Sequence, residues 1–224
     1  MTYYRLPEHA IPFLGRQNVG NWLWRNAERL EGCNRYDGIV ENSCQFFRQI
    51  GAVMFESKAA IDADGSGGNA HGDRYYQADT SLHTPEDEPL NAETWPFAVI
   101  PLPSRALGEF NIQDVGLALG DFGVCIYNGR VCPFIFGDAG PREKIGEISM
   151  HLARQLRIPD SPVDGGIDKK TVMETGGVIT LAFPYSAKKQ GRRTLVYPQG
   201  IEVYGMTLWR EFLAQARMLD QCVS

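Results

Sequence analysis

The dipeptide Asn128-Gly129 restricts the fold of this chain more than any other local feature of the sequence. It joins two mostly apolar runs, residues 123–127 and 130–136. A two-residue Asn-Gly loop favours a type I′ turn, whose twist matches that of two antiparallel strands. The sequence therefore predicts a hairpin in which the residues on either side of the turn pair with each other.

Several other short segments have the composition of strands. Residues 97–102 are an apolar run ended by prolines, and residues 115–119 and 176–184 are apolar runs bounded by turn-forming residues. Short strands at such close intervals are typical of a barrel or a sandwich. We therefore expect a compact β-barrel or sandwich, built mainly from residues 57–145.

Apolar residues recur at helical spacing near both ends of the chain. Four segments are predicted to be helices on this basis: residues 16–30, 41–50, 147–157 and 207–219. We therefore expect an α+β chain without a linker. A helical extension over residues 1–56 would pack on a β-rich core domain over residues 57–224.

The five cysteines are an odd number, so at least one cannot form a disulfide within the chain. Cys125 and Cys132 would face each other across the hairpin, at a wide pair where a disulfide is harder to close. Cys33 and Cys44 could also pair, and the sequence leaves both bonds open. The four histidines are scattered and no C-x-x-C is present, so we expect no zinc site.

The formal net charge of −5 argues against a nucleic-acid partner, which would require a basic face. No apolar stretch approaches the ~20 residues that span a membrane. Residues 1–9 lack the basic start and apolar run of a secretory leader, so we expect export, if it occurs, by another route. The sequence does not indicate a compartment.

Two carboxylates, Asp138 and Glu147, lie nine positions apart on either side of the turn Gly140-Pro141. A turn can bring two such residues together, and paired carboxyl groups roughly 6–10 Å apart carry out inverting glycoside hydrolysis. The alternative is structural. An Asp in such a turn often binds its own backbone, and a Glu in a first helical turn complements the helix dipole.

Six short motifs follow one another along the chain, with the hairpin segment 124–130 between the third and the fourth. They are Ala60-Ile61-Asp62-Ala63-Asp64-Gly65, Asp79-Thr80-Ser81-Leu82, Leu119-Gly120-Asp121, Gly137-Asp138-Ala139-Gly140-Pro141, Ile145-Gly146-Glu147-Ile148-Ser149 and Thr180-Leu181-Ala182-Phe183-Pro184. In this order and spacing they resemble the fungal-type chitosanases, glycoside hydrolase family 75. The likeness extends over residues 57–215. Residues 1–56 have no counterpart in it.

The resemblance implies a fold related to the double-psi β-barrel and an endo-acting, inverting hydrolase of β-1,4-linked amino-sugar polymers. The family's essential Asp and Glu would fall on Asp138 and Glu147, and the resemblance implies no cofactor. A predicted helix start at Glu147 would favour its ionised form and make it the base. Desolvation after the apolar run 134–136 would make Asp138 the acid.

Acidic and polar residues near this pair are candidates for binding the substrate. A glucosamine polymer carries ammonium groups, which carboxylates bind by charge-assisted hydrogen bonds. The candidates are Asp62, Asp64, Asp79, Thr80, Ser81 and Tyr76. Each of the acidic ones could instead cap a turn, and we expect this of Asp121. Asp62 and Asp64 also resemble the start of a calcium loop, but the twelfth position is Asp73 rather than Glu, so no metal is predicted.

Two other readings stay open. The chain could cut the glycan strand of peptidoglycan, as a hydrolase or lytic transglycosylase, and act as an antibacterial toxin delivered without a signal peptide. Residues 1–56 would then bind an immunity protein or a secretion machine. Alternatively, the barrel binds glycans without catalysis, and Asp138 and Glu147 only hold a turn.

Overall fold

The computed structural model describes residues 21–68, 71–190 and 197–222, and within them a single nine-stranded sheet dominates the fold. Its strands are β1 (Glu28–Arg29), β2 (Gln45–Phe47), β3 (Ala52–Ser57), β4 (Ala60–Asp62), β5 (Phe97–Pro101), β6 (Phe122–Tyr127), β7 (Arg130–Gly140), β8 (Glu147–Ser149) and β9 (Val178–Phe183). They pair in the order β1-β2-β3-β9-β6-β7-β5-β8-β4, so the sheet is open, with β1 and β4 at its edges. The expected α+β class is confirmed.

The predicted hairpin is confirmed as β6 and β7. Cys125 pairs with Cys132, and the turn residues Asn128 and Gly129 have φ angles of 46° and 75°, the positive values that a type I′ turn requires. Both cysteines are buried free thiols. Since β9 pairs with the other edge of β6, this hairpin lies inside the sheet.

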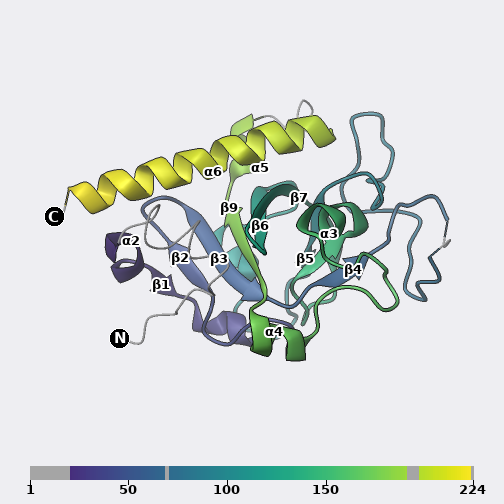
Figure 1. Ribbon diagram of the computed structural model, residues 1–224, viewed down its shortest axis with the longest axis horizontal. Coiled ribbons are helices and arrows are strands. Elements are labelled where there is room, and N and C mark those ends of the chain that lie inside the picture. The colour runs from purple at the N-terminus through teal and green to yellow at the C-terminus, as the bar shows by residue number, and fades with distance from the viewer. Residues whose placement is uncertain (1–20, 69–70, 191–196, 223–224) are drawn as a thin grey trace.

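Five α-helices and two short 3₁₀ helices accompany the sheet in the described residues. They are α2 (Asn21–Arg25), α3 (Met150–Leu156), α4 (Lys169–Thr175), α5 (Ser186–Gln190), α6 (Pro198–Gln221), η1 (Glu31–Arg35) and η2 (Ile112–Val115). The long helix α6 lies along one side of the sheet (Figure 1). The helix predicted over residues 207–219 is confirmed within it.

Buried side chains lie on both faces of the sheet because successive strand residues point in opposite directions. Met54 and Ile126 pack with Phe212 of α6 on one face. Phe55 and Leu152 of α3 belong to the core on the other face. The strands β3, β6 and β9 are thus buried on both sides.

Parallel pairing is confined to the end of the sheet that contains β4. β4 pairs in parallel with β8, and β5 pairs in parallel with β7. The β5–β7 register skips one residue: Ala98 is opposite Phe136, but Val99 is opposite Asp138, so Gly137 is an extra residue in β7. This β-bulge changes which way the next side chains point. A side chain at Gly137 would not fit, because its Cβ would lie 2.7 Å from Phe97 Cβ.

Three secondary-structure predictions are wrong. Residues 41–50 are not a helix, since Asn42 has a positive φ of 63° and residues 45–47 form β2, which pairs with β3. Residues 115–119 are not a strand, because Gly116 (φ 89°) turns the chain directly after η2. The helix predicted from residue 147 begins only at Met150. The aromatic and apolar residues of the first segment alternate between the two faces of the sheet, and long-range pairing decides this in favour of a strand.

The N-terminal part of the described chain contributes to the central sheet. The helix predicted over residues 16–30 corresponds, in the described part, to the short α2, and residues 16–20 lie outside it. The predicted division after residue 56 falls within β3, and β3 pairs with β9 along its length. Residues 45–57 therefore share one sheet with the candidate site.

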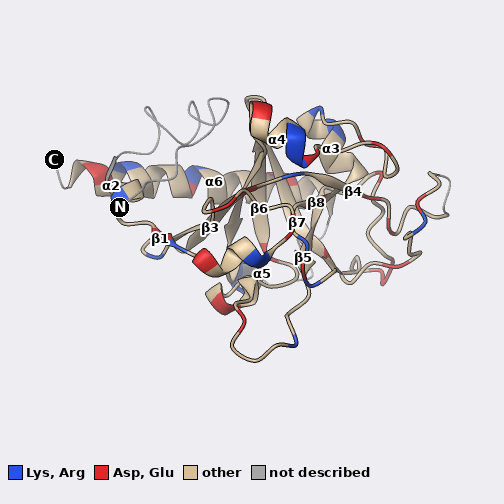
Figure 2. Ribbon diagram, turned by 90° about the horizontal axis from the view of Figure 1, so that it is seen from below, with Lys and Arg blue, Asp and Glu red and all other residues tan. Residues whose placement is uncertain are grey.

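Basic and acidic residues occur on several sides of the molecule (Figure 2). Basic side chains are found on α3 (Arg154), α4 (Lys169 and Lys170) and α5 (Lys188 and Lys189). None of the helices in the described ranges combines the length and the apolar character needed to cross a membrane.

Candidate active site

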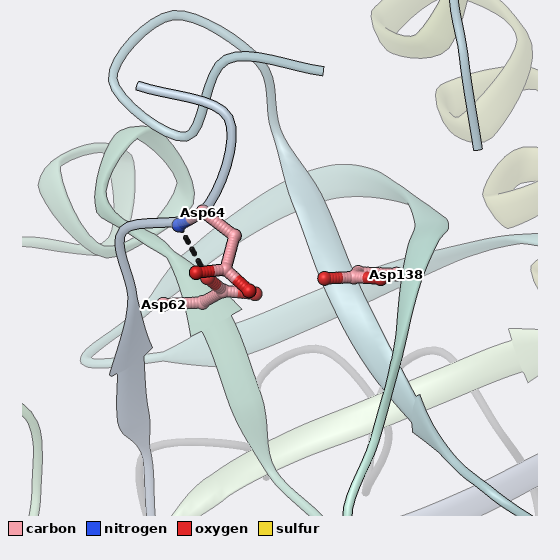
Figure 3. A group of neighbouring side chains, drawn as sticks. All are labelled: Asp62, Asp64 and Asp138. Atoms are coloured by element: carbon pink, nitrogen blue, oxygen red, sulfur yellow. Dashed lines mark hydrogen bonds between the residues drawn. The ribbon is translucent and has the colours of Figure 1, made fainter. Parts of the chain in front are cut away.

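Three aspartates from two distant parts of the chain form a buried acidic cluster. Asp62 ends β4, Asp64 follows it, and Asp138 lies in β7. A carboxylate oxygen of each lies within 4.8 Å of those of the other two, and Asp62 and Asp64 point toward Asp138 (Figure 3). The three residues are only 5%, 8% and 7% exposed. The structure thus brings together residues that the sequence separates by more than 70 positions.

Glu147 reaches the same place through the pairing of β4 with β8. Ala60 is opposite Glu147 and Asp62 is opposite Ser149, so Glu147 and Asp62 share one face of the pair, two residues apart in register. A Cβ added to Gly140 would lie 3.6 Å from Glu147 Oε2, which places the end of β7 next to the Glu147 carboxyl group.

Burial and mutual repulsion raise the pKa values of Asp62, Asp64 and Glu147. Burial raises the pKa of Asp62 well above its usual value, and the charge of Glu147 adds to the shift. Burial raises the pKa of Asp64 to about 6. Burial, then the charge of Asp64, raises the pKa of Glu147 to about 7, against an opposing contribution from Lys144. Part of the cluster is therefore protonated near neutral pH.

The predicted environment of Glu147 is wrong. Glu147 begins β8 instead of a helix, and α3 starts three residues later with Ser149 as its N-cap, whose Oγ accepts a hydrogen bond from Leu152 N. No helix dipole therefore favours the ionised form of Glu147. Desolvation dominates, and the pKa moves in the direction opposite to the predicted one.

One oxygen of Asp138 accepts three hydrogen bonds. Oδ1 is 2.9 Å from Ser81 N, 2.5 Å from Ser81 Oγ and 2.7 Å from Ala139 N. An ionised carboxylate is the stronger acceptor for such donors. The three contacts fix the orientation of the carboxyl group, and none of them involves Oδ2.

Asp62 and Asp64 also order the loop that follows β4. Asp62 Oδ1 accepts from Asp64 N at 2.7 Å, and Asp64 Oδ1 accepts from Gln77 N at 2.6 Å. Asp62 and Asp64 thus have the structural role in a turn that the sequence offered as an alternative, and they also belong to the acidic cluster. Tyr76 packs against the core, and its hydroxyl accepts from Gly68 N at 2.9 Å.

The candidates Asp79 and Thr80 hold the segment that leads to Ser81. Asp79 Oδ1 accepts from Thr80 N at 3.0 Å and lies 2.7 Å from His83 Nε2. Thr80 Oγ1 donates to Leu82 O at 2.9 Å and accepts from Leu90 N at 2.8 Å. Thr80 Oγ1 and Asp79 Oδ1 are therefore engaged within the protein, while the Asp79 side chain remains 73% exposed.

Asp121 has the structural role that its position in a turn predicts. Its carboxylate accepts hydrogen bonds from the backbone N–H groups of Ala118, Tyr185 and Ala187. It holds the turn before β6 to the segment after β9, and its predicted structural role is confirmed.

Sequence reasoning did not find two features of the site. Lys144 lies close enough to lower the pKa of Glu147, yet in the sequence it is one lysine in a polar turn. The bond between Ser81 and Asp138 joins residues 57 positions apart, and no local pattern indicates such a pair. From the sequence, Ser81 is a candidate either for binding a sugar hydroxyl or for a hydrogen bond at a strand edge.

The acidic cluster offers two kinds of chemistry. Asp62, Asp64 and Asp138 could each provide one oxygen to a cation. Alternatively, a group protonated near neutral pH beside a hydrogen-bonded carboxylate is the arrangement of a general acid and a general base. No protein-family model and no curated protein matches the chain.

Proposed function

We propose that the chain is an endo-acting glycoside hydrolase that cleaves β-1,4-linked amino-sugar polymers by inversion, with Asp138 and Glu147 as its catalytic pair. One observation carries the proposal. Glu147, whose pKa burial raises to about 7, adjoins the cluster in which Asp138 accepts three hydrogen bonds. The order of the six motifs supports the same assignment.

The surroundings of the two carboxyl groups support the reverse of the roles expected from the sequence. Glu147 retains a proton near neutral pH and donates it to the glycosidic oxygen of the leaving sugar. Asp138, oriented through Oδ1, accepts through Oδ2 the proton of a water that attacks the anomeric carbon from the opposite side. The hydrolysis consumes one water, and the site ends with Glu147 ionised and Asp138 protonated until solvent restores both.

The charge of the site favours a cationic sugar. Asp64, with a pKa of about 6, is mostly ionised at neutral pH and lies beside the proposed catalytic pair, and a carboxylate binds ammonium groups through charge-assisted hydrogen bonds. A chitosan-like polymer carries such groups at each deacetylated sugar. The glycan of peptidoglycan is acylated and bears carboxylates, so an acidic cluster would repel it. We therefore propose chitosan-like polymers ahead of peptidoglycan.

The relation to the double-psi β-barrel belongs to the same proposal. The parallel pairs β4–β8 and β5–β7, within a sheet that is otherwise antiparallel, support it. These pairs also carry Asp62, Asp138 and Glu147, so the proposed fold relationship concerns the part of the sheet where the site lies.

The test is digestion of two substrates by the full chain. Chitosan and purified peptidoglycan sacculi are incubated separately, and the soluble products are analysed by mass spectrometry and by NMR of the anomeric protons. We expect chitosan oligomers with inverted anomers. Asp138→Asn and Glu147→Gln should each lower turnover by at least about 100-fold. The exposed neighbour Glu143→Gln is the matched control and should act like wild type.

Other results of the two digestions would support the alternative functions. Release from sacculi alone would assign a peptidoglycan hydrolase, and 1,6-anhydro products would assign a lytic transglycosylase. Release from neither substrate would favour a glycan-binding protein. Wild-type turnover by Asp138→Asn would overturn the proposed pair.

A further inference from the structure

Ser81 contacts the Asp138 carboxylate through both its backbone and its side chain. Its N–H and its hydroxyl both donate to Asp138 Oδ1, at 2.9 Å and 2.5 Å. Two donors from one residue to one oxygen restrict the carboxylate more than one donor does, because the oxygen cannot rotate without breaking both bonds.

The proton on the Ser81 hydroxyl has a defined direction. Ser81 Oγ accepts the backbone N–H of Ala139 at 3.1 Å, so its own O–H is free to donate to Asp138. The Ala139 N–H is shared with Asp138 Oδ1, at 2.7 Å. A serine hydroxyl provides one donor and also accepts, and both capacities are used here. The three groups form a closed set of hydrogen bonds around one carboxylate oxygen.

The backbone fixes Ser81 at this position independently of Asp138. Leu82 N donates to the carbonyl of Gly137 at 3.0 Å, so the segment 79–82 is tied to β7 at its bulge. Thr80, the residue before Ser81, donates from Oγ1 to Leu82 O and accepts there from Leu90 N. Ser81 is thus held on a segment with bonds on both sides, and its hydroxyl is oriented before any substrate binds.

Asp138 Oδ1 is therefore occupied, and the reaction is left to Oδ2. From this geometry we infer that Ser81 is a positioning residue, which holds Asp138 through Oδ1 so that Oδ2 faces the attacking water. This inference rests on the proposed function, in which Asp138 is the base. It differs from the expectation that Ser81 binds a sugar hydroxyl, because the hydroxyl proton is directed to Asp138.

The test is the pH–rate profile of Ser81→Ala on the substrate that the full chain cleaves. The alanine keeps the backbone N–H bond and removes the hydroxyl. We expect kcat to fall by about 10- to 100-fold, as for a misplaced catalytic group. KM should stay near the wild-type value, and the acid limb of the profile should move to higher pH, because the ionised base loses a donor. Ser81→Thr keeps a hydroxyl and should restore most of the loss.

Ser161→Ala is the matched control. Ser161 Oγ also donates to an aspartate, Asp164, but on an exposed loop after α3. It should leave kcat, KM and the pH profile unchanged. A raised KM in Ser81→Ala with unchanged kcat and acid limb would overturn the inference and assign Ser81 to substrate binding. Wild-type kinetics in Ser81→Ala would also overturn it.

A measurement without substrate separates this inference from the proposed function. In ¹H–¹⁵N NMR spectra, Asp138→Asn should shift the Ser81 and Ala139 amide resonances, and Ser81→Ala should shift that of Ala139. Unchanged resonances would show that the contact is absent in solution, whatever the activity. If Asp138→Asn moves these resonances but retains turnover, the contact exists and the proposed function fails.

Discussion

Asp62 and Glu147 lie on one face of the parallel β4–β8 pair, because Glu147 is opposite Ala60, two residues before Asp62. Asp62 is 5% exposed, and the charge of Glu147 contributes to its raised pKa. Burial raises the pKa of Glu147 to about 7, so this group titrates near neutral pH. The strand register thus brings the two carboxyl groups to one face, and burial raises the pKa of both.

Glu147→Gln is expected to increase the free energy of unfolding at pH 8. The pKa of Glu147 is raised from 4.5 to about 7 in the folded chain, so between these values the folded chain binds more protons than the unfolded one. Stability therefore falls as the pH rises from 4.5 to about 7 and stays reduced above it. The neutral glutamine removes this cost, a gain on the order of 1–2 kcal/mol.

Urea denaturation of both proteins at pH 4.5 and pH 8 measures this gain, with Glu143→Gln as control. The difference between wild type and Glu147→Gln should be small at the lower pH. If the two proteins differed in free energy of unfolding by the same amount at both pH values, the raised pKa of Glu147 would be contradicted. A pure packing effect of the substitution does not depend on the charge of Glu147.

Asp64→Asn is expected to move the alkaline limb of activity to lower pH. The negative charge of Asp64 is the second cause of the raised pKa of Glu147, and asparagine removes it while its oxygen can still accept from Gln77 N. Glu147 then loses its proton at lower pH, and kcat/KM at pH 8 should fall several-fold.

The profile of kcat/KM against pH measures this shift, and Asp62→Asn is the comparison. Burial and the charge of Glu147 raise the pKa of Asp62 well above its usual value, and Asp62 is not among the causes that raise the pKa of Glu147, so its replacement should leave the alkaline limb where it is. A larger shift in Asp62→Asn than in Asp64→Asn would contradict the causes we assign to the raised pKa of Glu147.

Chelators are expected to leave activity and thermal stability unchanged. Oδ1 of Asp62, Asp64 and Asp138 each accepts at least one backbone N–H, and metal ligands must also be deprotonated. Thermal unfolding with EDTA or with added calcium measures this. A midpoint that rises with calcium in wild type but not in Asp64→Asn would instead show a cation site.

One thiol in the native protein is expected to react with Ellman's reagent, and all five after unfolding. Cys222 is exposed, whereas Cys33, Cys44, Cys125 and Cys132 are buried. Burial raises the pKa of Cys125 to about 12 and that of Cys132 to about 11, which suppresses the reactive thiolate. Cys222→Ser should show no rapid reaction. Rapid reaction of a second thiol would indicate local opening of the sheet.

The elements that local chemistry defines were predicted well. Asn128-Gly129 determined a hairpin and its register because a type I′ turn permits one pairing. The apolar stripe of residues 207–219 predicted part of α6, and the polar turn at Asp121 predicted a structural carboxylate. In each case the residues that decide the structure are neighbours along the chain.

Partners far away in the chain decided the rest. The segment Gln45–Phe47 forms a strand because β3 pairs with it, although the apolar spacing of residues 41–50 also fits a helix. Glu147 is in a strand because β4 and β5 lie beside it, so burial replaces the helix dipole that its local sequence predicted. The pKa of a carboxyl group depends on what surrounds it in space, and the sequence lists only its neighbours along the chain. The motif order could therefore indicate which acids belong together, while only the folded sheet determines which of them keeps its proton.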